Sequence, residues 1–151
     1  DGQNVIGQNV TIEQYGVAGP VDVFIPNGTP IYVMGFGAIP MNLLCVGREV
    51  RVFLNSTISS PLTATLVKVI PEKHTGKVTD VNVDTLKVDR GASVIETVVV
   101  SPDAKILGSI GDNQAPLSFA NIEVNDYIWY FGLTGCGTDT TFYAYVIIVT
   151  E

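Results

Sequence analysis

The stretch Val124-Asn-Asp-Tyr-Ile-Trp-Tyr-Phe131 decides the fold, because Val46-Gly-Arg-Glu-Val-Arg-Val-Phe53 repeats its shape at an offset of 78 residues, from 46 to 124. Each copy begins with a polar turn pair that runs directly into an expected strand. Each is followed by a loop and a long β-rich run, Leu62–Ile70 or Phe142–Val149. The offset is about half of the 151 residues, which indicates a duplicated β unit.

Strand-forming patterns continue through the rest of the chain. Val21–Ile25 alternates, Ser93–Ser101 is dense in β-branched side chains, and both features favour strands. No useful length of chain has the i, i+3, i+4, i+7 apolar spacing of an amphipathic helix. We therefore predict an all-β chain of two tandem small antiparallel β-barrels of the OB (oligosaccharide-binding) type, at residues 1–71 and 72–151. Units of this size lie near the lower limit for a self-sufficient core.

Turn residues and alternation add local predictions. The turn Pro26-Asn27-Gly28 predicts that Val21–Ile25 and Ile31–Met34 form a hairpin. The segment Pro71–Gly76 predicts a linker between the units, and Pro102-Asp103 predicts a turn at the end of a strand. In the first copy of the repeat, alternation puts Val50 and Val52 on one face and leaves Arg48, Glu49 and Arg51 to solvent.

The first unit is short by most of a strand. Gln8–Gln14 matches Asp84–Arg90 of the second unit, but almost nothing stands ahead of it to match Gly76–Val83. A barrel without that strand exposes unpaired backbone groups and an apolar groove. Three fillers remain open, namely Asp1–Ile6, the other half of the chain, or a strand from another copy.

The second unit has an ordered series of elements: Gly76-Lys77-Val78, Leu86–Val88, Ala104–Ile106, the turn Asn125-Asp126 before Tyr127, and Ala144–Ile148. This series resembles a family of small bacterial β-barrel domains of unknown function, often found in tandem in exported proteins. In the first unit, Gly47-Arg48 stands where that family has an acidic turn residue. The resemblance implies the fold and export, and it brings no catalytic residue.

The composition points to a protein with a covered surface. Hydrophobic residues make up 46% of the chain and charged residues 15%, with a mean hydropathy of +0.35. Soluble domains usually carry about 25% charged residues, so we expect a partner to cover some apolar surface. No run approaches the roughly 20 apolar residues that cross a bilayer. A net charge of −7 with scattered Lys and Arg argues against nucleic-acid binding.

Several features are those expected of a secreted or cell-surface protein. A chain that starts at Asp1, without a methionine or a leader, is expected of a mature protein after removal of its signal peptide. Cys45 and Cys136 either form a disulfide between the two halves or stay as buried free thiols, and export favours the disulfide. Three Asn-x-Ser/Thr sequons would permit glycosylation, at Asn9, Asn27 and Asn55.

No residue cluster predicts catalysis, and we expect the protein not to be an enzyme. His74, the only histidine, has Glu72 near it but no nucleophile or second acid at a recognisable spacing. Cys136 has no cation beside it in the sequence that would lower its pKa. We therefore interpret His74 as a linker residue.

Calcium is the one metal that the sequence leaves open. Asp80-Val-Asn-Val-Asp84 begins like a calcium loop but lacks the later Gly and Glu, and strand alternation would instead bury Val81 and Val83. A low-affinity calcium site made by the loop residues Asp112, Asn113 and Asp139 stays an alternative to our expectation of no cofactor.

Aromatic residues gather on the last two expected strands. Alternation places Tyr127 and Trp129 on one face and Tyr130 on the other, and it pairs Tyr143 with Tyr145. Both faces carry large apolar area, whereas a surface sheet normally leaves one face polar. One face is expected in the barrel core, and the other against the neighbouring unit, a subunit or a sugar.

Two functions follow from these observations. The first is an exported structural protein, a homopolymer subunit of an extracellular fibre or surface assembly joined by β-strand addition. Its predicted interface residues are Val5, Ile6, Val10, Tyr127, Trp129, Tyr130, Tyr143 and Tyr145. The alternative is an OB-like module that binds an oligosaccharide, a peptide or calcium.

Overall fold

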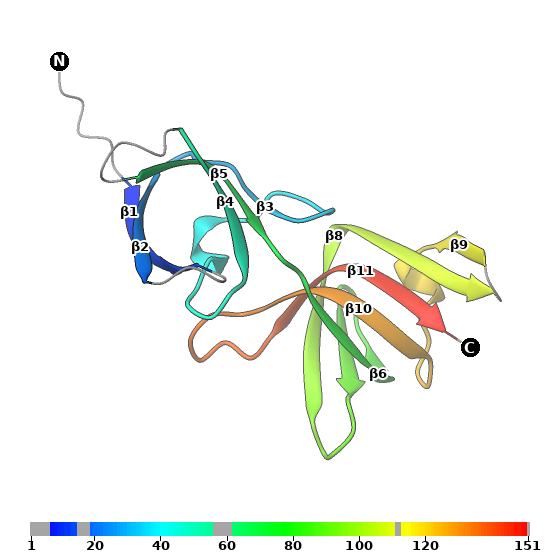
Figure 1. The fold of residues 1–151 in the computed structure, drawn as a ribbon. Coiled ribbons are helices and arrows are strands. Elements are labelled where there is room, and N and C mark those ends of the chain that lie inside the picture. Colours follow the sequence, from blue (N-terminus) through cyan, green and yellow to red (C-terminus); the bar gives the residue numbers. More distant parts are fainter. Residues whose placement is uncertain (1–6, 15–18, 56–61, 111–112, 151) are drawn as a thin grey trace.

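The chain is almost entirely β. The computed structural model describes residues 7–14, 19–55, 62–110 and 113–150. Within these ranges there are eleven strands, two short 3-10 helices and no α-helix, so the predicted all-β class is confirmed (Figure 1). No helix in this part of the chain has the length and apolarity that crossing a membrane requires.

The strands divide into two sheets at the short connection between residues 69 and 72. The first sheet contains β1 (Gly7–Glu13), β2 (Pro20–Pro26), β3 (Ile31–Val33), β4 (Val50–Leu54) and β5 (Leu62–Val69), with η1 (Met41–Leu43) before β4. The second contains β6 (Glu72–Val81), β7 (Thr85–Asp89), β8 (Ile95–Ile110), β9 (Asn113–Leu117), β10 (Tyr127–Thr134) and β11 (Phe142–Thr150), with η2 (Phe119–Asn121) before β10.

The second sheet closes into a five-stranded barrel. Its strands follow the order β6, β7, β8, β11, β10 and back to β6, while β9 pairs only with the outer part of β8. The β8–β11 pair is parallel and the other pairs are antiparallel. The largest side chains of its core are fully buried: Leu86, Ile128, Tyr130, Phe142 and Ile147.

The first sheet curls in the same way but stays open (Figure 1). Its central strand, β5, is parallel to β2 and β3 on one side and antiparallel to β4 on the other, and β1 pairs with β2. Among the described residues, β1 and β4 therefore each have a single neighbour. The core of this unit includes Val23, Ile25, Val33, Val67 and Val69.

The two units pair their strands in corresponding registers. A bulge interrupts the β4–β5 pair between Phe53 and Leu54, and another interrupts the β10–β11 pair between Phe131 and Gly132. The offset from Phe53 to Phe131 is the same 78 residues that separate the repeated stretches. In addition, β5 lies parallel to β2 and β3 as β11 lies parallel to β8. The first unit thus has counterparts of β7, β8, β10 and β11, and within the described residues it has none of β6.

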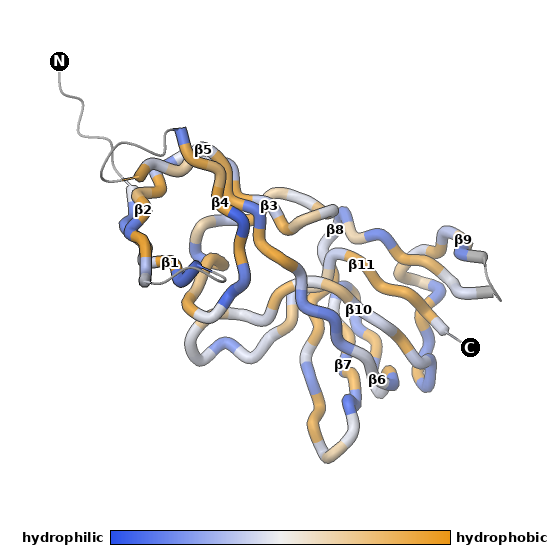
Figure 2. The backbone as a smooth tube through the Cα atoms, in the orientation of Figure 1, coloured by the Kyte–Doolittle hydropathy of each residue, from blue (hydrophilic) through white to orange (hydrophobic). Residues whose placement is uncertain are grey.

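Apolar residues are concentrated along β11 and the middle of β5 (Figure 2), and each of these strands has neighbours on both sides. The end of the second unit also contributes to the first core. Leu133 of β10 is fully buried in the first hydrophobic cluster, and Tyr145 packs against it. The two units are therefore in direct apolar contact at their junction.

Some local predictions were wrong. β2 and β3 form no hairpin, because each pairs in parallel with β5 and the turn after Pro26 carries the chain onward in the same direction. Pro71–Gly76 is no linker, since β6 begins at Glu72. β8 runs through Pro102-Asp103, and its pairing with β11 shifts register there. Val83 is 96% exposed in the turn between β6 and β7, so it is no core residue.

Candidate functional site

An open seam separates β1 from β4 in the first unit. A cavity of about 240 Å³ lies along it, and its lining is mostly apolar: Ile12, Val21, Val23, Val50, Val52, Leu54 and Leu62, with Glu13 and Gln14 at one end. The lining comes from both sides of the gap, from β1 and β2 and from β4 and β5. The seam is thus an apolar groove bordered by two strand edges.

The side chains at the seam are less buried than their counterparts in the closed barrel. Val50 and Val52 on β4 are half-buried. The corresponding residues of β10, Ile128 and Tyr130, have no exposed area, because β6 lies beside β10 and completes the wall. The β4 side chains have no such cover among the described residues.

The β1 side of the seam shows the same difference. Ile12 is half-buried, while its counterpart Val88 on β7 is fully buried beside β6. The backbone at the seam is also incompletely satisfied, because an edge strand leaves every second N–H and C=O without a strand partner. The seam therefore offers two hydrogen-bonding edges and an apolar floor, which is the chemistry that an added strand satisfies.

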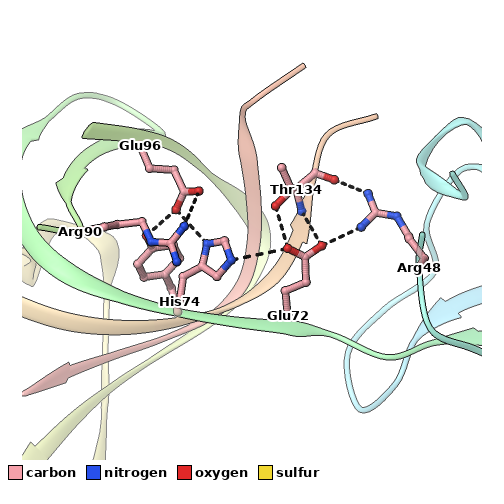
Figure 3. A network of polar contacts seen from close by, with 7 residues as sticks. Arg48, Glu72, His74, Arg90, Glu96 and Thr134 are labelled. Atoms are coloured by element: carbon pink, nitrogen blue, oxygen red, sulfur yellow. Dashed lines mark hydrogen bonds and ion pairs between the residues drawn. The ribbon is translucent and has the colours of Figure 1, made fainter. Parts of the chain in front are cut away.

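Arg48, just ahead of β4, joins the two units (Figure 3). Its side chain is only 6% exposed, so the prediction that it faces solvent was wrong. It donates to the Leu43 carbonyl at 2.6 Å, to the Thr134 carbonyl and to the Glu72 carboxylate at 2.9 Å. Glu72 in turn accepts hydrogen bonds from the Thr134 amide and hydroxyl. The positive charge of Arg48 in the first unit is thereby paired with Glu72, the first residue of β6 in the second unit.

The polar network continues into the second barrel through His74. This ring lies between Glu72, 3.5 Å from Nε2, and Glu96, 3.0 Å from Nδ1. Glu96 is buried, and it also accepts a hydrogen bond of 2.5 Å from the Tyr130 hydroxyl and pairs with Arg90 at 3.4 Å. His74 packs against Tyr130 and Phe142. It is a strand residue inside the barrel wall, which corrects its interpretation as a linker residue.

The network shifts two pKa values. Burial acts to raise the pKa of Glu72, but hydrogen bonds from Thr134 and the nearby Arg48 and His74 outweigh burial and hold that pKa below its usual value. Burial and the hydrogen bond to Glu96 raise the pKa of Tyr130. The network lines neither the seam cavity nor the larger groove described below. Its members bind one another, which is the arrangement of a structural network.

A disulfide joins Cys45, ahead of β4, to Cys136, in the loop between β10 and β11. The two Cα atoms are 5.8 Å apart, and Nη2 of Arg48 lies 4.0 Å from Sγ of Cys136. The disulfide and the Arg48 contacts connect the same two loops. They fix the first unit onto the second with both covalent and polar links.

The predicted interface residues do not form one surface. Tyr127 and Trp129 are 47% and 40% exposed on the outside of the second barrel, where Nζ of Lys73 lies 3.8 Å from the centre of the Trp129 ring. Tyr130 is fully buried, so its assignment to a surface interface was wrong. Tyr145 packs on the first core.

The remaining predicted residues lie on β1, on β11, or outside the described part. Val10 of β1 is half-buried against the first core, whereas Val5 and Ile6 lie outside the described residues. Tyr143 donates a hydrogen bond of 2.9 Å to Asp139, which raises the pKa of Tyr143. The asparagines of the three sequons, Asn9, Asn27 and Asn55, are all exposed.

A second groove, of about 620 Å³, lies where β8 changes register. Val83, Asp84, Phe119 and Tyr143 are among its lining residues. Asp112, one of the residues considered for calcium, lies outside the described residues. Within the described ranges, no group of three or more His, Cys, Asp or Glu side chains is placed to hold a metal ion.

No protein-family model, curated protein or solved structure matches this chain. The resemblance to tandem β-barrel domains of exported bacterial proteins therefore stays a prediction.

Proposed function

We propose that this chain is a non-catalytic, exported structural protein whose copies assemble into an extracellular fibre or surface layer by β-strand addition. The observation that carries the proposal is the open seam between β1 and β4 in the first unit. An added strand would pair with one or both edges and place alternate side chains in the apolar groove.

The closed barrel indicates what such a strand would do. The second unit follows the order β6–β7–β8–β11–β10 with a parallel β8–β11 pair, and we infer that both units are OB-like. The first unit would then lack only the strand equivalent to β6. Fully burying one exposed Val or Leu side chain contributes about 1.5–3 kcal/mol. Val50, Val52 and Leu54 are already half-buried, so an added strand that completes their burial would gain a part of this energy from each of them.

The rest of the molecule suits a repeating subunit. The charged fraction is only 15%, which leaves more apolar surface for contacts between copies. The disulfide and the Arg48 contacts hold the two units together. In a rigid subunit with an open seam, every copy would contact the next with the same relative orientation. Such a head-to-tail contact forms an open filament unless the rotation between copies closes a ring.

The test compares the full chain with two variants at increasing concentration, using gel filtration and negative-stain electron microscopy. We expect the unmodified protein to form polymers and Val52→Asp to stay monomeric, because the new carboxylate would be buried by an added strand. Phe53→Asp is the matched control, since Phe53 is exposed on the outer face of β4 and polymers should persist. Circular dichroism checks that both variants fold. A monodisperse unmodified monomer, or full assembly of Val52→Asp, would refute the proposal.

A second candidate function is ligand binding in the groove at the β8 register shift. The observation in its favour is the size of that groove, about 620 Å³, together with Phe119, Tyr143 and Asp84 in its lining. Aromatic rings and a carboxylate are suited to holding a sugar. Titration with oligosaccharides, a short peptide and calcium, followed by NMR shifts of the lining residues, tests this candidate. If none of these ligands shifts the NMR signals of the lining residues, ligand binding in this groove is eliminated.

A further inference from the structure

We propose that the strand that fills the seam comes from the residues preceding Gly7 in a second copy, Gly2–Ile6 among them. This inference rests on the proposed function and names the donor segment. It follows from a difference between the two units at the start of β1, where the described part of the chain begins.

Strand pairing aligns β1 with β7. Val23 pairs with Leu62 in the first unit as Val98 pairs with Phe142 in the second. Across the next ladder, Val10 pairs with Val23 and Leu86 pairs with Val98. Val10 is therefore the counterpart of Leu86, and Gly7 and Gln8 are the counterparts of Val83 and Asp84.

In the second unit, these counterparts turn the chain back. The residues between β6 and β7 are Asn82, Val83 and Asp84, and the Asn82 amide donates to the Thr85 carbonyl at 2.8 Å. This turn is what places β6 antiparallel beside β7. The strand that closes the second barrel thus comes from the chain immediately before the turn.

In the first unit, the same positions are extended strand. Gly7 pairs with Pro26 and Gln8 pairs with Ile25, so β1 begins two residues earlier than its counterpart β7. Gly7 is packed so closely that an added Cβ would collide with the Ile25 carbonyl oxygen and the Phe24 ring. Gly7 and Gln8 therefore lack the turn that brings β6 back beside β7 in the second unit.

The donor segment has the chemistry that the seam requires. Gly2-Gln-Asn-Val5 has the same sequence as Gly7-Gln-Asn-Val10, which forms most of β1. Gly2–Ile6 carries no charge, and Val5 and Ile6 supply an apolar side chain to whichever face enters the groove. Five residues span about 17 Å as a strand, the same length as the five-residue β4. Strand-forming sequence without charge fits an apolar groove between two edges.

The first test is a disulfide cross-link between differently tagged chains, with the native Cys45–Cys136 bridge left in place. Chains carrying Val5→Cys, or Ile6→Cys for the other strand face, are mixed with chains carrying Val50→Cys and oxidised. We expect a reducible product that contains both tags. Phe53→Cys, on the outer face of β4, is the matched acceptor control, and it should give little of the product that contains both tags. A double variant Val5→Cys/Val50→Cys that links only within one chain would overturn the proposal.

The second test removes residues 1–6 from the full chain. We expect this variant to stay folded, to lose polymerisation, and to bind a synthetic peptide of Asp1–Ile6 in its empty seam. A peptide with Val5→Asp and Ile6→Asp should not bind. Polymers that persist after the deletion would refute this donor while leaving the proposed function intact, whereas an unmodified protein that never assembles would refute the proposed function itself.

Discussion

Val52 of the first unit and Tyr130 of the second occupy the same position in the repeated strand, yet Val52 is half-buried while Tyr130 has no exposed area. The two strands have the same partner on one side, β5 or β11, with the bulge at the same place. They differ on the other side, where β10 pairs with β6 and β4 has no partner among the described residues. A missing neighbour, rather than a different sequence pattern, therefore explains the exposed apolar edge.

The outer aromatic face of the second barrel should be dispensable for assembly. Trp129→Ala removes an exposed ring and its contact with Lys73, which is worth about 0.5–1 kcal/mol at an exposed site. Because this ring lies on the second barrel and the seam lies on the first, we expect polymers of unchanged morphology by electron microscopy. Loss of polymers in Trp129→Ala, with Val52→Asp still assembling, would move the interface from the seam to this face.

Removing the disulfide should destabilise the chain. The Cys45–Cys136 bridge spans a sequence separation of 91 residues, and loss of a native disulfide typically costs about 2–5 kcal/mol. We expect the double variant Cys45→Ala/Cys136→Ala to unfold at a lower urea concentration, as followed by circular dichroism. An unchanged unfolding midpoint would mean that the Arg48 contacts alone hold the junction.

Tyr130→Phe should destabilise the second barrel without changing its shape. The variant removes the hydroxyl that donates to the buried Glu96 carboxylate, and a hydrogen bond to a charged group contributes about 1.5–3 kcal/mol. Tyr127→Phe is the control, since Tyr127 lies on the same strand and is 47% exposed. Urea unfolding should separate the two variants, and equal midpoints would show that His74 and Arg90 already satisfy Glu96.

Acid should weaken the junction through Glu72. Its pKa is lower in the folded state than the usual 4.5, so the ionised carboxylate stabilises the fold fully above about pH 4.5 and loses that effect as the pH falls through the folded value. We expect Glu72→Gln to be less stable than the unmodified protein near neutral pH and to approach it in acid. Unfolding midpoints of both proteins from about pH 7 to about pH 3 measure this. A difference that stays constant with pH would contradict the assignment.

Local sequence signals predicted the parts of the fold that depend on local physics. The all-β class follows from alternation and β-branched density, and the missing strand follows from comparing Gln8–Gln14 with Asp84–Arg90. The β2–β3 hairpin was wrong because a turn signal at Pro26–Gly28 cannot reveal pairing with β5, which lies more than thirty residues further along the chain. Parallel pairing of this kind has no short-range sequence signature.

The junction network was missed for a different reason. Arg48 looked like a solvent residue because its partners, Glu72 and Thr134, come from the other unit. Glu96 carried a usable signal, since it alternates with Val98 and Val100 on the inward face of β8. A single carboxylate at an inward position of a Val-rich strand predicts buried polar partners. His74 and Tyr130 are two of the polar partners of Glu96 in the structure, but the sequence does not show that they lie within hydrogen-bonding distance of it.

Amide hydrogen exchange of the full chain, before and after assembly, tests the central claim most directly. An added strand would hydrogen-bond to the free edges of β1 and β4, so we predict slower exchange in Gly7–Glu13 and Val50–Leu54 on assembly. β9 (Asn113–Leu117), which among the described strands pairs with β8 alone, is the internal control and should exchange at its monomer rate. Polymers in which β1 and β4 exchange as fast as in the monomer would contradict strand addition at the seam.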